Sequence, residues 1–191
     1  AGFMILKGNI CEAGVMKTSV ISDNFRTQYL SKPGSKNVFE IRAIVFEGPE
    51  DYHERINNPE LNIDVDCILV IRGCGPIGYP GSAEVVNMQP PDSLIRKGIL
   101  ELPTLGDGRQ SGTSGSPSIL NVSPESAIGG GLALLQTGDM LRIDLNRCTI
   151  DVLIDERELQ KRRDLLQLDE TENQTPWQEI YRNTVGQLSG G

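Results

Sequence analysis

The sequence predicts a mixed α/β fold in a single domain, and two observations carry this prediction. Strand-like apolar runs and short helical patterns alternate along the 191 residues, but without an even strand–helix rhythm. An even rhythm is typical of a doubly wound parallel sheet, so its absence favours a sheet with mixed connections. The length suits one domain that buries a sizeable core, and no internal repeat divides it.

The first half of the chain contains two predicted strands with a helix between them. Residues 38–47 alternate and then become continuously apolar with β-branched side chains, as a strand does where it enters a core. Pro49 and the two acids after it favour a short helix over residues 49–58, which Pro59 ends. The apolar run 67–72 lies between turn residues, which predicts a strand buried on both faces.

Weaker patterns follow, and then a hairpin. Residues 83–88 and 93–97 each favour the start of a short helix, with two prolines between them. Residues 99–105 predict a weak strand. Residues 140–145 and 148–154 both alternate, and the short connection between them predicts a β-hairpin.

A helix is predicted directly after the hairpin. Asp155 stands where an N-cap residue is expected, and Glu158 follows it at the capping-box spacing. The helical pattern then continues to residue 167. Its basic cluster, residues 161–163, predicts a solvated face.

The stretch 106–131 predicts a ligand-binding loop. It contains seven glycines and six serines, and almost no large apolar residue before Ile119. Glycine lets the backbone approach a ligand closely, and successive free amides can form an anion-binding nest. A flexible linker is the alternative, but isolated charges such as Asp107 and Arg109 are unusual in linkers. We therefore expect an ordered loop that holds a small acidic or phosphorylated ligand.

Composition excludes two classes of partner. A net charge of −8 and an isoelectric point near 4.7 disfavour nucleic acid, and no basic stripe with interleaved aromatics is present. No apolar run approaches the ~20 residues that cross a bilayer, so we expect no membrane insertion. Four cysteines without a CxxC pair, and no secretory segment at the start, predict reduced thiols in a cytoplasmic protein.

The titratable residues argue against several kinds of catalytic site. The single histidine, His53, lies in a charged helical segment and is predicted at the surface, so a Ser-His-Asp triad has no base. One histidine and scattered cysteines offer no zinc-ligand spacing. The loop rich in glycine and serine lacks the GK[ST] ending of a P-loop, which argues against a nucleoside triphosphate.

Oxygen chemistry remains open to this chain. Glu84, in a turn after a strand, is a candidate magnesium ligand, although an ordinary acid at a helix start explains it equally well. Ser111 and Thr113 lie two residues apart in a glycine-flanked turn, where both can face one ligand. Serine is a poor base without a nearby cation, so a catalytic role for Ser111 requires a metal brought from elsewhere.

Several blocks of the sequence resemble the dihydroxyacid and phosphogluconate dehydratase (IlvD/Edd) family. The strongest are GPIGYPGSAEVVNM from residue 75, LGDGRQSGTSG from residue 105, and the long block from VSPESAIGGG at residue 122 to QKRR. GNICEAGVMKTS, FEGPEDYHERINNP and TPWQEIYR also resemble this family, so the resemblance covers nearly the whole chain. TPWQEIYR is most similar to the sugar-acid (aldonate) dehydratase branch.

The resemblance implies a lyase that removes water from a 2,3-dihydroxy acid and gives a 2-keto-3-deoxy acid. Members use an iron–sulfur cluster, commonly [2Fe-2S], and a magnesium ion. By motif position, Ser111 matches the serine proposed as the base, Thr113 its substrate-contacting neighbour, and Glu84 a magnesium-ligating carboxylate. The implied fold is a swivelling β/β/α domain, with a barrel-like mixed sheet and short helices.

The chain also departs from the family pattern. The cluster cysteines and the other magnesium ligands belong to a large amino-terminal domain, which nothing here resembles. We therefore expect residues 1–191 to be an isolated carboxy-terminal domain that holds no cluster ligand and is inactive alone. Its expected partners are the missing domain, a sugar acid and further copies of the protein. The alternatives are a non-catalytic module that binds a small acid, and a dihydroxyacid dehydratase of branched-chain amino-acid synthesis.

Overall fold

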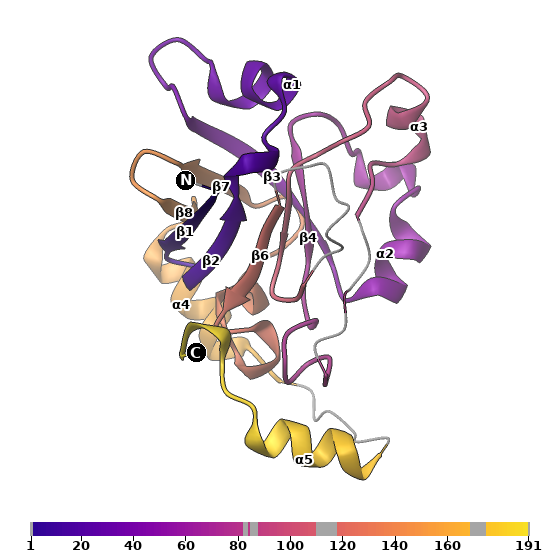
Figure 1. Cartoon of the computed structure of the whole chain (residues 1–191), viewed down its shortest axis with the longest axis vertical. Coiled ribbons are helices and arrows are strands. Elements are labelled where there is room, and N and C mark those ends of the chain that lie inside the picture. Colours follow the sequence, from indigo (N-terminus) through magenta and orange to yellow (C-terminus); the bar gives the residue numbers. More distant parts are fainter. Residues whose placement is uncertain (1, 82–83, 85–87, 110–117, 169–174, 191) are drawn as a thin grey trace.

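Eight strands form a closed barrel in the computed structural model, which describes residues 2–81, 84, 88–109, 118–168 and 175–190 (Figure 1). Around the barrel the strand order is β1-β2-β6-β5-β4-β3-β7-β8. The strands are β1 (Phe3–Gly8), β2 (Cys11–Lys17), β3 (Val38–Phe46), β4 (Cys67–Ile71), β5 (Thr104–Gly106), β6 (Ser118–Ser123), β7 (Met140–Asp144) and β8 (Thr149–Val152). This architecture confirms the expected barrel-like mixed sheet.

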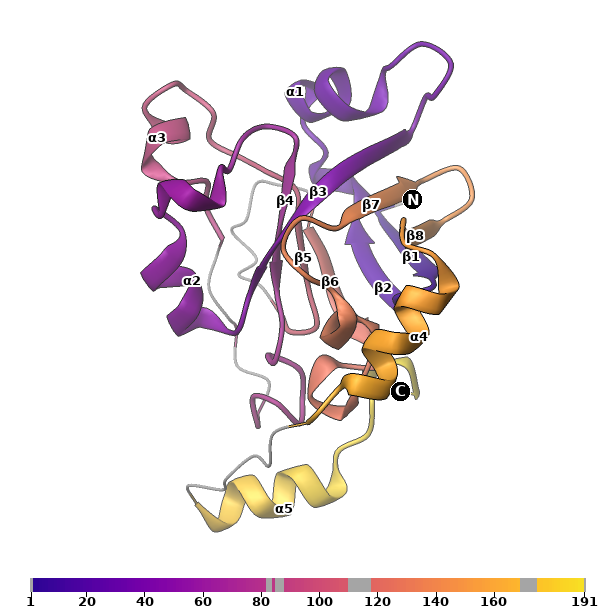
Figure 2. The ribbon, with the colours of Figure 1, turned by 180° about the vertical axis from the view of Figure 1, so that it is seen from behind.

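Short helices surround the barrel (Figure 2). The α-helices are α1 (Asp23–Phe25), α2 (Pro49–Arg55), α3 (Asp92–Ile95), α4 (Glu156–Leu165) and α5 (Pro176–Thr184). Single turns of other helical types are η1 (Thr18–Val20), η2 (Arg26–Leu30), η3 (Pro59–Leu61), η4 (Ser126–Ile128), η5 (Gly131–Leu134) and η6 (Leu188–Gly190). Within the described part of the chain, no helix has the length and apolar character needed to cross a bilayer.

Parallel and antiparallel pairing are combined in the barrel. Strands β3, β4, β5 and β6 are parallel neighbours, whereas β1–β2, β2–β6, β3–β7 and β7–β8 are antiparallel. A parallel bridge between Lys7 and Thr149 joins β1 to β8. Because β3 to β6 run in the same direction, their carboxyl ends meet at one end of the barrel, which we call the site end.

Strand β4 is buried along its whole length because it separates two hydrophobic cores. Ile68 and Val70 belong to the core that fills the barrel. Leu69 and Ile71 belong to a second core between the barrel and the helices α2 and α3. Side chains alternate across a strand, so both faces must be apolar when each meets a core. The prediction of a doubly buried strand is thus confirmed.

Local capping explains where the longer helices begin. The Asp155 carboxylate accepts a hydrogen bond of 2.8 Å from the backbone N–H of Glu158, which confirms the predicted N-cap of α4. In α5, Thr175 and Gln178 form a reciprocal capping box. The predicted helix over 49–58 and hairpin over 140–154 are also present, as α2 and as β7–β8.

Two predicted boundaries are wrong. The strand expected over 99–105 is confined to Thr104–Gly106; Pro103, which has no N–H, cannot donate to the ladder. The loop expected over 106–131 contains a barrel strand, Ser118–Ser123. Ile119 and Val122 of that strand enter the core, while its buried serines are satisfied by hydrogen bonds, so a polar composition did not mean an exposed loop.

The solvated face expected at residues 161–163 is also corrected. The Arg162 side chain is only 12% exposed and forms ion pairs with Asp139 and Glu158. Asp139 lies on a different segment, before β7, and was not expected near this helix. Lys161 and Arg163 are exposed, as predicted. The helix expected over 83–88 falls mostly outside the described residues.

Candidate functional site

Charged and polar residues follow each of the parallel strands at the site end. Glu47 follows β3, Arg72 follows β4, Asp107 follows β5, and Glu125 lies two residues beyond β6. In parallel sheets the carboxyl ends of the strands are the usual place for a ligand site, because loops from several strands meet there. The loops that carry Glu84 and the glycine- and serine-rich segment both start at this end.

Asp107 joins the bases of these loops. It is fully buried, and its carboxylate accepts hydrogen bonds from the backbone N–H groups of Gly73 (3.1 Å), Cys74 (2.9 Å) and Ser126 (2.9 Å). The Ser126 hydroxyl donates a further bond of 2.6 Å to Asp107 and accepts one of 2.7 Å from Gly73. Gly73 has a φ of 75°, which a residue with a side chain rarely adopts. We call Gly73, Cys74, Asp107 and Ser126 the loop anchor.

Glu125 holds the next part of the same loop. It is buried, and its carboxylate accepts hydrogen bonds from the backbone N–H groups of Ile77 and Gly78 and from the Gln187 side chain, at 2.8–3.1 Å. A side chain at Gly75 would collide with Glu125, because an ideal Cβ there would overlap the Glu125 side chain. The loop after β4 is therefore shaped by two buried carboxylates and by Gly75, which fits closely against Glu125.

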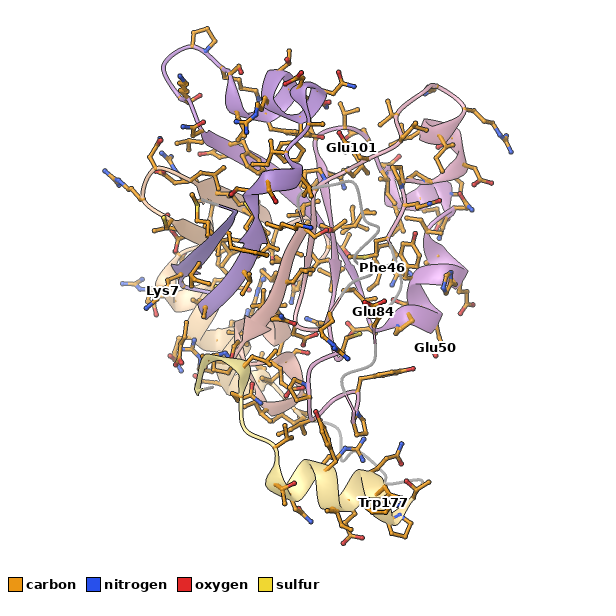
Figure 3. The ribbon with its side chains drawn as sticks, viewed as in Figure 1. Lys7, Phe46, Glu50, Glu84, Glu101 and Trp177 are labelled. Carbon is orange, nitrogen blue, oxygen red and sulfur yellow. The ribbon has the colours of Figure 1, made fainter. Side chains whose placement is uncertain are left out.

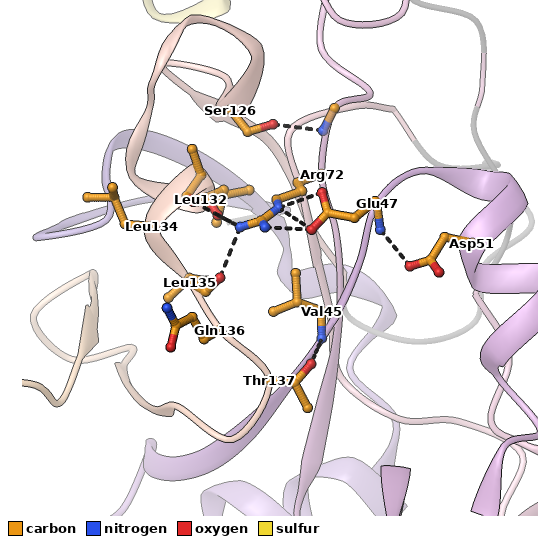
Figure 4. Close-up of polar contacts among 12 residues, drawn as sticks. Val45, Glu47, Asp51, Arg72, Ser126, Leu132, Leu134, Leu135, Gln136 and Thr137 are labelled. Atoms are coloured by element: carbon orange, nitrogen blue, oxygen red, sulfur yellow. Dashed lines mark hydrogen bonds and ion pairs between the residues drawn. The ribbon is translucent and has the colours of Figure 1, made fainter. Parts of the chain in front are cut away.

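Arg72 fixes a different segment, and each of its three side-chain nitrogens donates within the protein. Its Nε and Nη2 donate to the Glu47 carboxylate, and its Nη1 donates at 2.9–3.0 Å to the carbonyl oxygens of Leu132, Ala133 and Leu135 (Figure 4). A cavity of about 390 Å³ lies beside this arginine and is lined also by Gly73 and residues 166–168. Since all three side-chain nitrogens of Arg72 already donate hydrogen bonds within the protein, we assign Arg72 a structural role at the site end.

The structure brings Glu84 to the start of the glycine- and serine-rich loop. Glu84 and Arg109 form an isolated parallel β-bridge, so the two backbone segments lie side by side. Both side chains are exposed, and Glu84 is labelled in Figure 3. Arg109 precedes Ser111 by two residues in the sequence. Ser111 and Thr113 themselves fall outside the described residues, so their predicted roles stay predictions.

At the site end, Glu84 is suited to be one ligand of a magnesium ion. The described residues there do not form a binding site for an iron–sulfur cluster. An exposed carboxylate such as that of Glu84 is the oxygen donor that magnesium prefers, and magnesium needs only one or two such groups from protein. Within the ranges that the structure describes, no three His, Cys, Asp or Glu side chains come together around a possible metal position.

The four cysteines are poor candidates for cluster ligands because, in the described part of the chain, they do not come together around one position. Burial, with a smaller contribution from Asp151, raises the pKa of Cys11 to about 12. Burial also raises the pKa of Cys67 to about 11. The pKa of Cys74 is also raised, chiefly by burial and in second place by the Asp107 carboxylate. All four cysteines are free, and Cys148 alone among them is not fully buried.

Alkylation of the native chain at pH 8 is therefore expected to modify Cys148 first. Cys11, Cys67 and Cys74 are buried, so they should react only as fast as the barrel opens. Their raised pKa values slow the reaction as well, since each unit of raised pKa lowers the thiolate fraction about tenfold. Peptide mapping after a timed reaction with iodoacetamide measures this order. Labelling of Cys74 as fast as Cys148 would show that the loop anchor is open in solution.

Reasoning from the sequence missed the anchoring residues. Asp107 was noted only as a charge that argues against a linker, and Arg72, Glu125 and Ser126 were assigned no role. The partners of both carboxylates are mostly backbone amides, which leave no residue pattern. One available signal was that Asp107 immediately follows an apolar segment, where an acid must be satisfied if it is buried.

Comparisons with known proteins agree with the motif resemblance. The model of the family described as dihydroxy-acid/6-phosphogluconate dehydratase, C-terminal, matches residues 1–191. The chain is 62% identical to D-xylonate dehydratase of Caulobacter vibrioides over 191 residues, which is 100% of this chain and 32% of that protein.

Two further relatives match over most of the chain. It is 40% identical to L-arabinonate dehydratase of Rhizobium leguminosarum bv. trifolii over 162 residues, which is 84% of this chain and 26% of that protein. It is 36% identical to dihydroxy-acid dehydratase of Pyrococcus furiosus over 165 residues, which is 85% of this chain and 27% of that protein. The chain thus spans about a third of the length of its relatives, or less.

Proposed function

The chain belongs to the dihydroxy-acid/6-phosphogluconate dehydratase family, and from this membership we propose that the protein containing it is a sugar-acid dehydratase. The observation that carries the proposal is the similarity to a D-xylonate dehydratase along the whole chain, well above the similarity to a dihydroxy-acid dehydratase. An L-arabinonate dehydratase and a 6-deoxy-6-sulfo-D-gluconate dehydratase are also relatives. The proposed substrate class is therefore an aldonate. Four free cysteines fit a reducing, cytoplasmic compartment.

The proposed reaction is the elimination of water across C2 and C3 of the acid. A base takes the C2 proton, the C3–oxygen bond breaks, and the leaving hydroxyl takes up one proton, so that one water is lost overall and the base can be restored. The resulting enol tautomerises to a 2-keto-3-deoxy acid. A [2Fe-2S] cluster and magnesium, when bound, supply Lewis acidity toward the leaving hydroxyl and the substrate carboxylate.

Within this chain, three residues are proposed to act on the substrate or its metal. Ser111 takes the C2 proton, Thr113 contacts a substrate oxygen, and Glu84 is a magnesium ligand. The bridge between Glu84 and Arg109 supports this assignment, because it brings Glu84 beside the segment that leads to Ser111. Since the chain spans about a third of its relatives, we assign the cluster cysteines and the remaining magnesium ligands to an amino-terminal part of the protein.

Turnover by the full-length protein tests this proposal. With iron–sulfur cluster and magnesium present, D-xylonate and related aldonates are expected to give 2-keto-3-deoxy acids, detected by mass spectrometry as loss of one water. A branched-chain dihydroxy acid serves as the competing substrate. Preference for the branched-chain acid would contradict the assignment to sugar acids, and turnover of neither substrate by cluster-loaded protein would contradict the assignment as a dehydratase.

Substitution of Glu84 by glutamine is expected to raise the magnesium concentration needed for half-maximal activity. We expect a shift of at least about tenfold, since even loss of an outer-shell partner lowers metal affinity by 10–100-fold. The exposed side chain makes a fold defect unexpected. A magnesium titration of the full-length protein measures the shift, and Glu54→Gln on α2, another exposed acid, is the matched control. An unchanged titration would remove Glu84 from the metal site.

A further inference from the structure

Helix α5 has an apolar side that nothing in the described structure covers. No residue of the helix is buried. Trp177 is 78% exposed and Ile180 is 53% exposed. The two residues are three positions apart, so they lie on the same side of the helix. Figures 1 and 2 both show α5 beyond the site end of the barrel, and Figure 3 labels Trp177 far from the barrel strands.

The opposite side of α5 and the segment after it are attached to the barrel by polar contacts. Arg182 donates a hydrogen bond of 2.9 Å from its Nε to the carbonyl oxygen of Ile77, in the loop after β4. The Gln187 side chain accepts a hydrogen bond of 2.8 Å from the backbone N–H of Glu125 and donates one of 2.8 Å to the Glu125 carboxylate. Arg182 is two residues from Ile180, which places it on roughly the opposite side of the helix. The attachment therefore leaves the apolar side exposed.

Other exposed apolar side chains lie at the same end of the molecule. Tyr79 belongs to the loop held by Glu125, Ile128 ends η4, and Leu168 lies close to Gly129 beside Ile128. We call the exposed pair Trp177 and Ile180 the docking face; the other three side chains add to the apolar surface at this end of the molecule. Large exposed aromatic and aliphatic groups gathered in one region mark interaction sites more often than ordinary surface.

We propose that the docking face binds the amino-terminal part of the same protein. This rests on the proposed function in one respect, namely that the site is completed by a part of the protein that precedes this chain. Two observations select this occupant. The relatives are about three times as long as the chain, so a large part of the protein remains to be placed. Helix α5, which carries the docking face, is also bonded through its other side to the loop after β4. The base of that loop belongs to the loop anchor, as does Asp107 at the start of the segment leading to Ser111.

Hydroxyl-radical footprinting of the full-length protein tests the proposal without reference to activity. Trp177 and Ile180 are expected to be oxidised several-fold more slowly than their exposure here implies, after normalisation to the unfolded protein. Leu100, which is 70% exposed at the other end of the barrel, is the reference residue. Protection is expected to be equal at protein concentrations tenfold apart, because the occupant belongs to the same chain. Oxidation of Trp177 as fast as Leu100, or protection lost on dilution as for a second copy, would overturn the proposal.

A pair of variants gives an independent measurement. Trp177→Ala combined with Ile180→Ala is expected to speed limited proteolysis between the two parts of the full-length protein, whereas Leu100→Ala should not. The barrel should persist in both variants, since none of these side chains is buried in it. Equal proteolysis of the two variants counts against the docking face.

The outcome is separable from that of the proposed function. If Trp177 is protected in a protein that turns over no aldonate, the proposed docking stands and the proposed dehydratase activity is contradicted. Turnover of an aldonate with a fully reactive Trp177 would contradict docking alone.

Discussion

Replacement of Ser111 by alanine in the full-length protein is expected to abolish most aldonate turnover while the fold is retained. Loss of a general base typically lowers kcat by a factor on the order of 10²–10⁴. Steady-state kinetics with saturating aldonate and magnesium measure the loss, and circular dichroism checks the fold. KM should change less than kcat, because Ser111 is proposed both to contact the substrate and to take the C2 proton, and only the second role is confined to the chemical step.

Ser114→Ala is the matched control for this experiment. Ser114 lies in the same glycine-rich segment, three residues from Ser111, and is given no role in the reaction. It should keep near-normal turnover. Full activity of Ser111→Ala, or an equal loss in both variants, would mean that the proton is taken by another group.

Replacement of Asp107 by alanine is expected to destabilise the chain by about 4 kcal/mol. The backbone N–H groups of Cys74 and Ser126 and the Ser126 hydroxyl lose their acceptor at a fully buried position, and the Gly73 N–H keeps only its bond to the Ser126 hydroxyl. An unsatisfied buried donor or a lost bond to a charged group contributes about 1–3 kcal/mol, and partial relaxation reduces the sum. Asp107→Asn should be milder, at about 2–3 kcal/mol, because one amide oxygen can still accept.

Urea unfolding of the 191-residue chain, followed by far-ultraviolet circular dichroism, measures both losses. Asp164→Asn is the control, since this exposed acid bonds only to Gln160 among the described contacts and its asparagine variant can still accept that bond. A loss below about 1 kcal/mol for Asp107→Ala, the size of an average substitution, would show that Asp107 does not hold the loop anchor closed.

Elements set by local patterns could be predicted from the sequence. The strand at Cys67–Ile71 was found because a strand between two cores has no polar face, and the start of α4 because Asp155 is a short-range cap. The barrel-like closure came from the family resemblance rather than from the residues. One bridge between Lys7 and Thr149 closes the barrel, and no pattern in the sequence joins residues so far apart.

The site was only partly predictable for the same physical reason. Glu84 could be identified by motif and is brought beside the segment that leads to Ser111. The roles of Asp107 and Glu125 depend on backbone N–H groups from distant turns, which every residue type except proline carries and which therefore leave little signal in the sequence. Arg162 was misjudged because its partner, Asp139, lies on another segment and satisfies the charge away from water.

The loop anchor limits how this domain can be re-engineered for another acid. Asp107 belongs to the loop after β5, Gly73 and Cys74 to the loop after β4, and Ser126 to the turn after β6. A graft that altered the backbone path of one of these loops would separate the Asp107 carboxylate from its donors. Chimeras should therefore exchange the three segments as one unit, or change only the residues beyond the anchor.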